Sequence, residues 1–124
     1  MEKAWLALGV ALREDGEFLR PLRCFDRVIS MDPRSEKAYY NKALLLIKYG
    51  IRKDALMVID EGLSVNEKAL ILLLTKAGIL REMGEFGAAL ETYDRALAIN
   101  PEYKVTLYER QKCVEMMEKR RRKR

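Results

Sequence analysis

Residues 83–103 read MGEFGAALETYDRALAINPEY, and the pattern of this stretch occurs twice earlier in the chain. Residues 49–69 read YGIRKDALMVIDEGLSVNEKA, and residues 15–35 read DGEFLRPLRCFDRVISMDPRS. The three stretches follow one another at a spacing of 34 residues without an insertion, and they share a glycine, a leucine and an aspartate at matching positions. A fixed period of this length is typical of a repeat protein.

Each repeat predicts two helices joined by a glycine. Gly16, Gly50 and Gly84 follow the first helix of each repeat, where a left-handed residue commonly ends a helix and glycine adopts that conformation most easily. Apolar residues then recur at helical spacing, and strand signals are absent. The helices are expected at residues 2–14, 18–30, 35–48, 52–64, 67–82, 86–98 and 102–120.

Three acceptor side chains stand between the repeats. Asp32, Asn66 and Asn100 occupy matching positions of the three repeats, 34 residues apart, and we call such a set of positions a column. Prolines follow the first and the third of these residues. Because an acceptor at the N-cap and a proline at the first helical position both favour a helix start, we expect these residues to cap the helix that follows.

Composition restricts the chemistry that the chain can perform. With 124 residues, of which 49% are hydrophobic and 35% charged, the chain is expected to fold as a single domain. It has no histidine and two cysteines, Cys24 and Cys113, so the usual zinc sites and histidine-based triads cannot be built. Neither a nucleophile beside a base nor a glycine-rich phosphate loop occurs. We therefore expect no enzyme, no cofactor and no metal.

The cysteines and the apolar segments also indicate a compartment. Two cysteines so far apart in the sequence are expected to be free thiols in a reducing environment. No signal-peptide pattern is visible, and the longest apolar run, residues 69–74, is too short to span a bilayer. These features predict a cytoplasmic protein.

A set of aromatic, small and proline residues recurs at the packing positions of the repeats. They are Trp5, Leu8, Gly9, Leu12, Phe25 and Pro33; then Tyr39, Ala43, Leu46, Ala55 and Ile59; then Ala77, Leu80, Ala89, Tyr93, Ala96 and Pro101. This pattern resembles the tetratricopeptide repeat (TPR) family. The resemblance implies an all-α solenoid, a right-handed superhelix of antiparallel helix pairs, with the repeats at about 2–35, 36–69 and 70–103. It also implies a capping helix at about 104–118 that completes a single domain over residues 1–118.

The resemblance further implies a non-catalytic scaffold whose first helices line a concave groove. Here that groove is apolar with a charged rim, which suits an apolar or amphipathic partner segment. Tyr40 is the expected anchor, and Arg13, Lys37, Lys48 and Arg81 are expected to set the charge preference. The alternative is that the apolar residues only pack against neighbouring repeats. The candidate partner-binding residues are Leu6, Val10, Arg13, Lys37, Tyr40, Leu44, Ile47, Lys48, Ile71, Leu74 and Arg81.

One known use of the family leaves a recognisable pattern of side chains. Members that bind chaperones hold an acidic C-terminal peptide with lysine and asparagine side chains on three first helices. Of the five corresponding columns only Asn41 matches, and the others hold Leu6, Val10, Ile71 and Thr75. Recognition of a chaperone's C-terminal carboxylate is therefore not expected. Asn41 is expected to form a hydrogen bond within or between helices instead.

The net charge of +5 comes from the end of the chain, because without its last six residues the remainder carries −1. We expect this basic tail to be disordered, and it could serve solubility, bind nucleic-acid phosphates or lie on an anionic surface. It offers no aromatic residue for base stacking. The tail residues are Lys119, Arg120, Arg121, Arg122, Lys123 and Arg124.

Two further alternatives concern self-association and RNA. No repeat precedes the first helix in this sequence, so its packing face with Trp5, Leu8 and Leu12 is an open edge that invites a second copy. The groove itself could also hold a second copy. Helical-repeat readers of single-stranded RNA use a longer repeat and polar base-reading positions, which this chain lacks.

Overall fold

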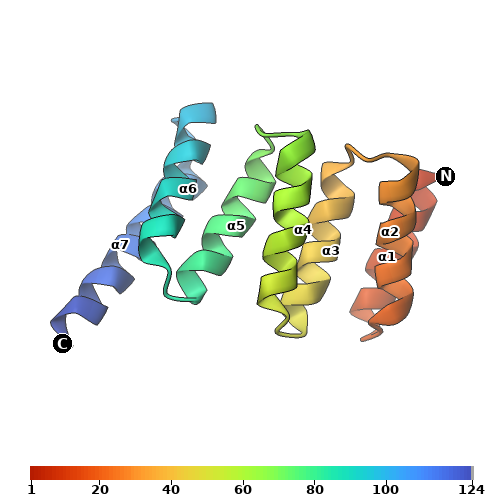
Figure 1. Cartoon of the computed structure of the whole chain (residues 1–124), viewed down its shortest axis with the longest axis horizontal. Helices are drawn as coiled ribbons and strands as arrows, with labels where there is room; N and C mark the ends of the chain where they lie inside the picture. Colours follow the sequence, from red (N-terminus) through yellow and green to blue (C-terminus); the bar gives the residue numbers. More distant parts are fainter. Residues whose placement is uncertain (124) are drawn as a thin grey trace. The chain divides into compact units, whose positions relative to one another are not determined.

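The structure is a computed structural model that describes residues 1–123, and every regular element in that range is an α-helix (Figure 1). The helices lie close to the ranges expected from the repeat. They are α1 (Glu2–Glu14), α2 (Leu19–Met31), α3 (Glu36–Lys48), α4 (Arg52–Val65), α5 (Leu70–Glu82), α6 (Phe86–Ile99) and α7 (Lys104–Arg122).

The glycine column ends the first helix of each repeat, as predicted. Gly16, Gly50 and Gly84 have φ values of +84°, +76° and +80°. In the first of these turns the amide of Glu17 donates to the carbonyl of Leu12 at 3.0 Å, and the same bond closes the other two. Because a side chain is strained at such φ values, the turn needs glycine at each of these positions.

The expected role of Asp32, Asn66 and Asn100 as N-caps is wrong. Each ends the preceding helix in an extended conformation, with φ between −140° and −150°. The carbonyl of Asp32 accepts from the amide of Ser35 at 3.1 Å, and Ser35 Oγ accepts from the amide of Ala38 at the start of α3. An aspartate or asparagine suits the first position of a β-turn as well as a cap, and here each of the three residues begins the turn between hairpins.

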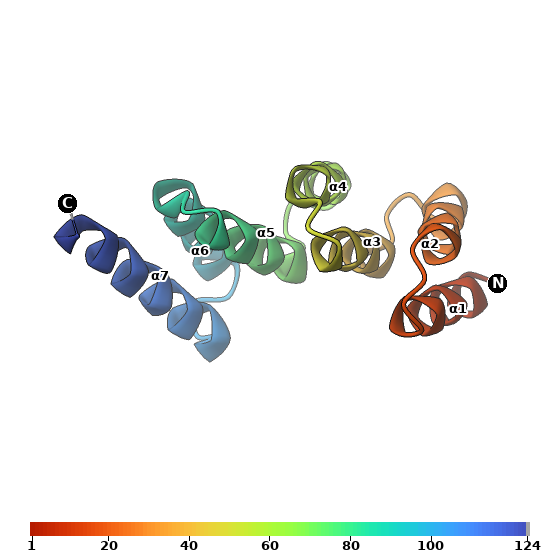
Figure 2. The same cartoon turned by 90° about the horizontal axis from the view of Figure 1, so that it is seen from below.

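The chain divides into two compact units, and the first comprises residues 1–72. In it α1 packs along α2, α3 packs along α4, and α3 also contacts α2 (Figure 2). The interior contains Phe25, Leu45 and Ile59, all without exposed surface. Gly9 lies against the Phe25 ring, where a Cβ would be 2.6 Å from Cε1, so this position of α1 requires glycine.

The second unit comprises residues 73–124, of which the structure describes 73–123. Its core is a cluster of Ala77, Phe86, Ala89, Tyr93 and Cys113, and α7 packs along α6 to complete it. Five partly buried apolar residues pack against this cluster. They are Leu74, Leu80, Leu90, Met116 and Met117.

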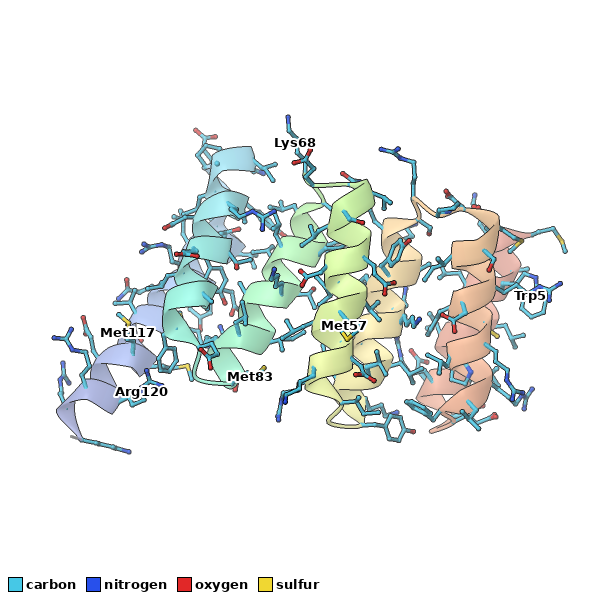
Figure 3. The ribbon with its side chains drawn as sticks, in the orientation of Figure 1. Trp5, Met57, Lys68, Met83, Met117 and Arg120 are labelled. Atoms are coloured by element: carbon cyan, nitrogen blue, oxygen red, sulfur yellow. The ribbon has the colours of Figure 1, made fainter. Side chains whose placement is uncertain are left out.

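The structure differs from the predicted capping helix and disordered tail, because α7 continues to Arg122. Arg120 Nη1 donates to the carbonyl of Gly84 at 2.8 Å, and its guanidinium lies 4.5 Å from the centre of the Phe86 ring. Figure 3 shows Arg120 at the end of the unit where α5 turns into α6. Cations also favour the C-terminus of a helix through its dipole. Residues 119–122 are therefore helical, while Arg124 lies outside the described residues.

Candidate functional site

A shallow pocket lies on the exposed side of α1, where the sequence predicts the first part of the groove. It measures about 400 Å³ and is lined mainly by α1, with Asn41 contributed by α3. Leu6 and Val10 lie together in it and are half-buried, and Lys3 and Glu14 are its charged residues. The structure therefore brings these two predicted apolar residues into one surface.

The matching face of α3 has the predicted apolar stripe. Tyr40, Leu44 and Ile47 follow one another at helical spacing and are all half-buried. Lys37, one turn before Tyr40, is exposed. Since none of the three apolar side chains is fully buried within the first unit, each keeps surface that a partner could cover.

Asn41 connects the two helices, as expected for a residue that is not part of a peptide clamp. Arg13 Nη1 donates to Asn41 Oδ1 at 2.9 Å, and Asn41 Nδ2 donates to the carbonyl of Lys37 at 2.8 Å. Lys48 Nζ donates to the carbonyl of Arg13 at 2.9 Å. Two cations that we expected on the groove rim, Arg13 and Lys48, therefore already have partners within the chain.

The remaining predicted residues lie on α5. Ile71 belongs to the first unit and is exposed, whereas Leu74 and Arg81 belong to the second. Leu74 packs against the buried cluster of that unit. Arg81 forms an ion pair with Glu109 of α7, and its side chain is only 12% exposed.

Arg81 is therefore an internal link of the second unit. Its Nη1 also lies 3.3 Å from Tyr93 Oη, within hydrogen-bonding distance. Burial raises the pKa of Tyr93 to about 12, although the positive charge of Arg81 acts in the opposite direction. Sequence reasoning missed this link because Glu109 is 28 residues from Arg81, beyond the range of any local pattern.

Neither cysteine has the features of a reactive thiol. Cys24 and Cys113 are both free and buried. Burial raises the pKa of each thiol, so the reactive thiolate is disfavoured. Among residues 1–123 no three histidine, cysteine or acidic side chains gather as metal ligands would, and no helix has the length and apolarity to cross a membrane.

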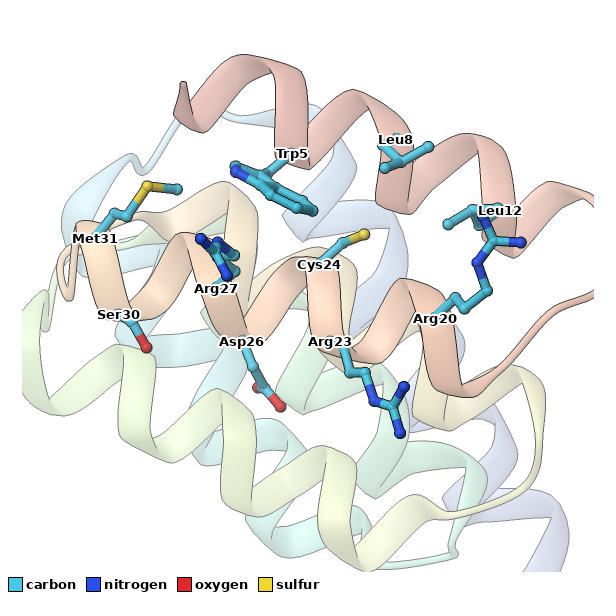
Figure 4. Close-up of a pocket in the computed structure, with 10 residues that line it drawn as sticks. All are labelled: Trp5, Leu8, Leu12, Arg20, Arg23, Cys24, Asp26, Arg27, Ser30 and Met31. Carbon is cyan, nitrogen blue, oxygen red and sulfur yellow. The ribbon is translucent and has the colours of Figure 1, made fainter.

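A larger pocket of about 870 Å³ lies on the outer side of the first hairpin (Figure 4). Trp5, Leu8 and Leu12 of α1 line this pocket. They are the residues that the sequence predicts on the open packing face of the first helix. Sequence reasoning missed the arginines that α2 contributes to the same pocket. Their spacing at residues 20, 23 and 27 places them on one helix face and could have indicated a cationic stripe.

Comparison with known proteins gives one family and several relatives. Residues 71–103 match the family model described as tetratricopeptide repeat. The chain is 27% identical over 92 residues to the TPR repeat-containing protein MJ1428 of Methanocaldococcus jannaschii, which covers 74% of this chain and 16% of that protein. It is also 27% identical over 107 residues to Tetratricopeptide repeat protein 6 of Homo sapiens, and this match covers 86% of this chain and 20% of that protein. The chain thus spans a fifth or less of the length of these curated relatives.

Solved structures show the same fold. The first TPR domain of human RPAP3 matches with a TM-score of 0.84 and 14% identity, over 98% of this chain and 96% of that one. The first TPR of Spaghetti (RPAP3), bound to the HSP90 peptide SRMEEVD, matches with a TM-score of 0.80 and 14% identity, over 94% and 92%. At such identities the likeness shows the fold alone.

Proposed function

Because this chain is a tetratricopeptide-repeat protein, we propose that it is a non-catalytic module that binds an apolar or amphipathic segment of a protein partner. The binding surface of this proposal is the exposed side of the first helices α1 and α3 in the first unit. The two free cysteines are compatible with a reducing, cytoplasmic location, which we propose as well.

The observation that carries the proposal is the group of half-buried apolar side chains on these two helices. Leu6 and Val10 share the α1 pocket, and Tyr40 and Leu44 lie on the corresponding face of α3. Covering the remaining surface of an aliphatic side chain stabilises a complex by about 0.8 kcal/mol per buried methylene. Tyr40 adds an aromatic ring, which is enriched among the residues that dominate interface energies.

The chemistry of this surface does not suit an acidic peptide of the kind bound in the Spaghetti structure. Leu6 and Val10 occupy positions where a carboxylate clamp needs donors, and they offer none. The amide of Asn41 is engaged at both ends, by Arg13 and by the Lys37 carbonyl. We therefore propose that this chain does not recognise a chaperone's C-terminal carboxylate.

The test is selection of peptides from a random display library on the whole chain, followed by affinity measurements on the selected peptides. Leu44→Glu places a charge in the apolar stripe and is expected to weaken binding at least about tenfold. Met57→Glu is the matched control, since Met57 is 62% exposed on α4, outside the first helices. Peptides that bind Leu44→Glu as tightly as wild type contradict the surface assignment, and tight binding of SRMEEVD contradicts the exclusion of acidic peptides.

An anionic polymer is the second candidate partner. Lys119, Arg121 and Lys123 are exposed at the end of α7, whereas Arg120 contacts Gly84 and Phe86. Reversing the charge of Lys119 and Arg121 together keeps the Arg120 contacts. If this candidate is correct, the double variant loses retention on duplex DNA at low salt. If wild type is not retained at all, the candidate is excluded.

A further inference from the structure

The pocket on the outer side of the first hairpin is an apolar surface that the first unit leaves open. Trp5 is half-buried and Leu8 is 42% exposed on α1, and Met31 of α2 is also exposed beside them (Figure 4). Leu12 and Cys24 form the buried floor. The groove residues Leu6 and Val10 line a different pocket, so this surface is separate from the one in the proposed function.

The second hairpin shows what such a surface accepts. Six residues that line the first pocket have counterparts 34 positions later that line a smaller pocket of about 310 Å³, and its remaining lining residue is Leu22 of α2. The helix that packs on this face of the second hairpin is α2 of the first hairpin, which contacts α3. Tyr39 Oη donates to the Pro33 carbonyl at 2.8 Å, and Lys42 Nζ pairs with Asp26 at 2.7 Å. In the second hairpin, therefore, the face that corresponds to the open pocket is covered by a helix of the preceding repeat.

The charge around the open pocket distinguishes it from its counterpart. Arg20, Arg23 and Arg27 of α2 line it, and the matching columns of the second hairpin hold Asp54, Met57 and Glu61. Arg27 lies over the Trp5 ring at 4.8 Å, and Figure 4 shows Arg20 reaching toward Leu12.

Two carboxylates lie close to these arginines, and each already has a cation. Glu17 pairs with Arg20 at 3.2 Å and so offsets one of the three rim charges, whereas Asp26 pairs with Lys42 of α3, which leaves the charges of Arg23 and Arg27 in excess. The rim therefore remains cationic and is complementary to an acidic occupant. A second copy of the same face would place arginines against arginines, and the C-terminal segment of the chain is itself basic.

We propose that the open face of the first hairpin binds a partner helix with an apolar stripe flanked by carboxylates. The stripe covers Trp5, Leu8 and Leu12 in the way that α2 covers the equivalent face of α3. The carboxylates pair with Arg23 and, in exchange for the partly exposed Glu17, with Arg20 on the rim.

The probe is a fluorescein-labelled synthetic helix of about five turns, with leucines on one face and glutamates beside them. A second probe has lysines in place of the glutamates. Fluorescence anisotropy with the whole chain is expected to show binding of the acidic probe only, and the affinity should fall as salt is raised.

Two variants test the surface. Leu8→Glu is expected to weaken the acidic probe at least about tenfold, and the double variant Arg20→Glu/Arg23→Glu about tenfold. Both arginines lie in the N-terminal half of α2, where acidic side chains are compatible with the helix dipole. Arg52→Glu/Lys53→Glu makes the same change of net charge at the start of α4 and should leave the affinity unchanged.

Several outcomes overturn the proposal. They are absence of binding, equal binding of both probes, and loss of binding in Leu6→Glu but not in Leu8→Glu, which would place the probe in the groove. Light scattering across a range of concentrations tests the remaining occupant. A wild-type dimer that Leu8→Glu dissociates would assign the face to a second copy and overturn the proposal too.

Discussion

The outer faces of the first and second hairpins use the same columns of the repeat, but they have different surroundings. Tyr39 is buried and donates to the Pro33 carbonyl, whereas Trp5, in the same column, is half-buried beneath the Arg27 guanidinium. Lys42 pairs with Asp26 of α2, whereas Leu8 in its column is exposed. The residue in a column therefore reflects what lies opposite it and not the repeat alone.

The second unit supports this interpretation. Arg110 of α7 stands in the column of Lys42, and its Nε donates to Asp94 of α6 at 2.9 Å. Asp94 is in turn the repeat counterpart of Asp26. A cation thus occupies the column where a helix with this aspartate is adjacent, and a leucine occupies it on the open face.

The largest contrast is expected from truncating the two aromatic residues of the shared column. Tyr39→Ala should lower the free energy of unfolding by about 3 kcal/mol, because it removes a buried ring and leaves a cavity. Trp5→Ala should lower it by about 1 kcal/mol, because the indole keeps contact with water in the native protein. Urea unfolding followed by circular dichroism measures both, and equal losses would show that the first face is not open.

A smaller effect is expected at Gly62, which lies under Tyr39. A Cβ there would be 2.7 Å from Leu72 Cδ1 and 2.9 Å from Tyr39 Cγ. Gly62→Ala should therefore destabilise by about 1 to 2 kcal/mol, in spite of the better helix propensity of alanine. Gly78→Ala is the control, since a Cβ there meets no atom within 4 Å, and it should stabilise by up to about 1 kcal/mol. A stabilised Gly62→Ala would contradict the close approach.

The ion pair between the hairpins is expected to contribute less. Asp26 and Lys42 are partly exposed, so a double-mutant cycle with Asp26→Asn and Lys42→Met should give a coupling below about 1 kcal/mol. Leu8→Lys introduces the same cation on the open face, where Asp26 of the same pocket is already paired with Lys42, and should leave the unfolding free energy nearly unchanged. A marked stabilisation by Leu8→Lys would show that a carboxylate is within reach.

The smallest contrast is expected between the pKa of Tyr39 and the pKa of a tyrosine placed at position 5. Burial, and then the negative charge of Glu61, raise the pKa of Tyr39 above its usual value near 10. The native state therefore holds this proton more tightly than the unfolded state, and stability that is complete below pH 10 declines as the pH rises further. Trp5→Tyr places a phenol on the open face, and its pKa should stay closer to the usual value. Carbon-13 NMR of labelled tyrosine measures both, and equal pKa values would contradict the difference in burial.

Much of the fold could be predicted because its signals are local. The glycine column, the apolar spacing and the absence of strand patterns lie within single repeats, and the helix bounds follow closely from them. The caps at Asp32, Asn66 and Asn100 were misassigned because an aspartate or asparagine, with or without a following proline, is compatible with both a cap and a turn. The tail was misassigned because Arg120 is held by Gly84 and Phe86, which are distant in sequence.

The candidate site was predictable to a smaller extent. Helical spacing placed Leu6 and Val10 on one face, and Tyr40, Leu44 and Ile47 on another, since a periodic pattern defines a face. It did not indicate that Arg13 and Lys48 bond within the chain or that Arg81 pairs with Glu109. Spacing shows which side of a helix a cation occupies, but the partner comes from another helix.

Repeat, helices and the chemical character of each face thus follow from the amino-acid order, because backbone preferences and amphipathic spacing act over a few residues. Packing between helices decided which of these residues are available. It paired Arg81 with Glu109, engaged Asn41 at both ends and covered Tyr39, while the equivalent face with Trp5 and Leu8 stayed open. The reason is physical: burial and pairing depend on atoms that are distant along the chain and meet only when the helices pack.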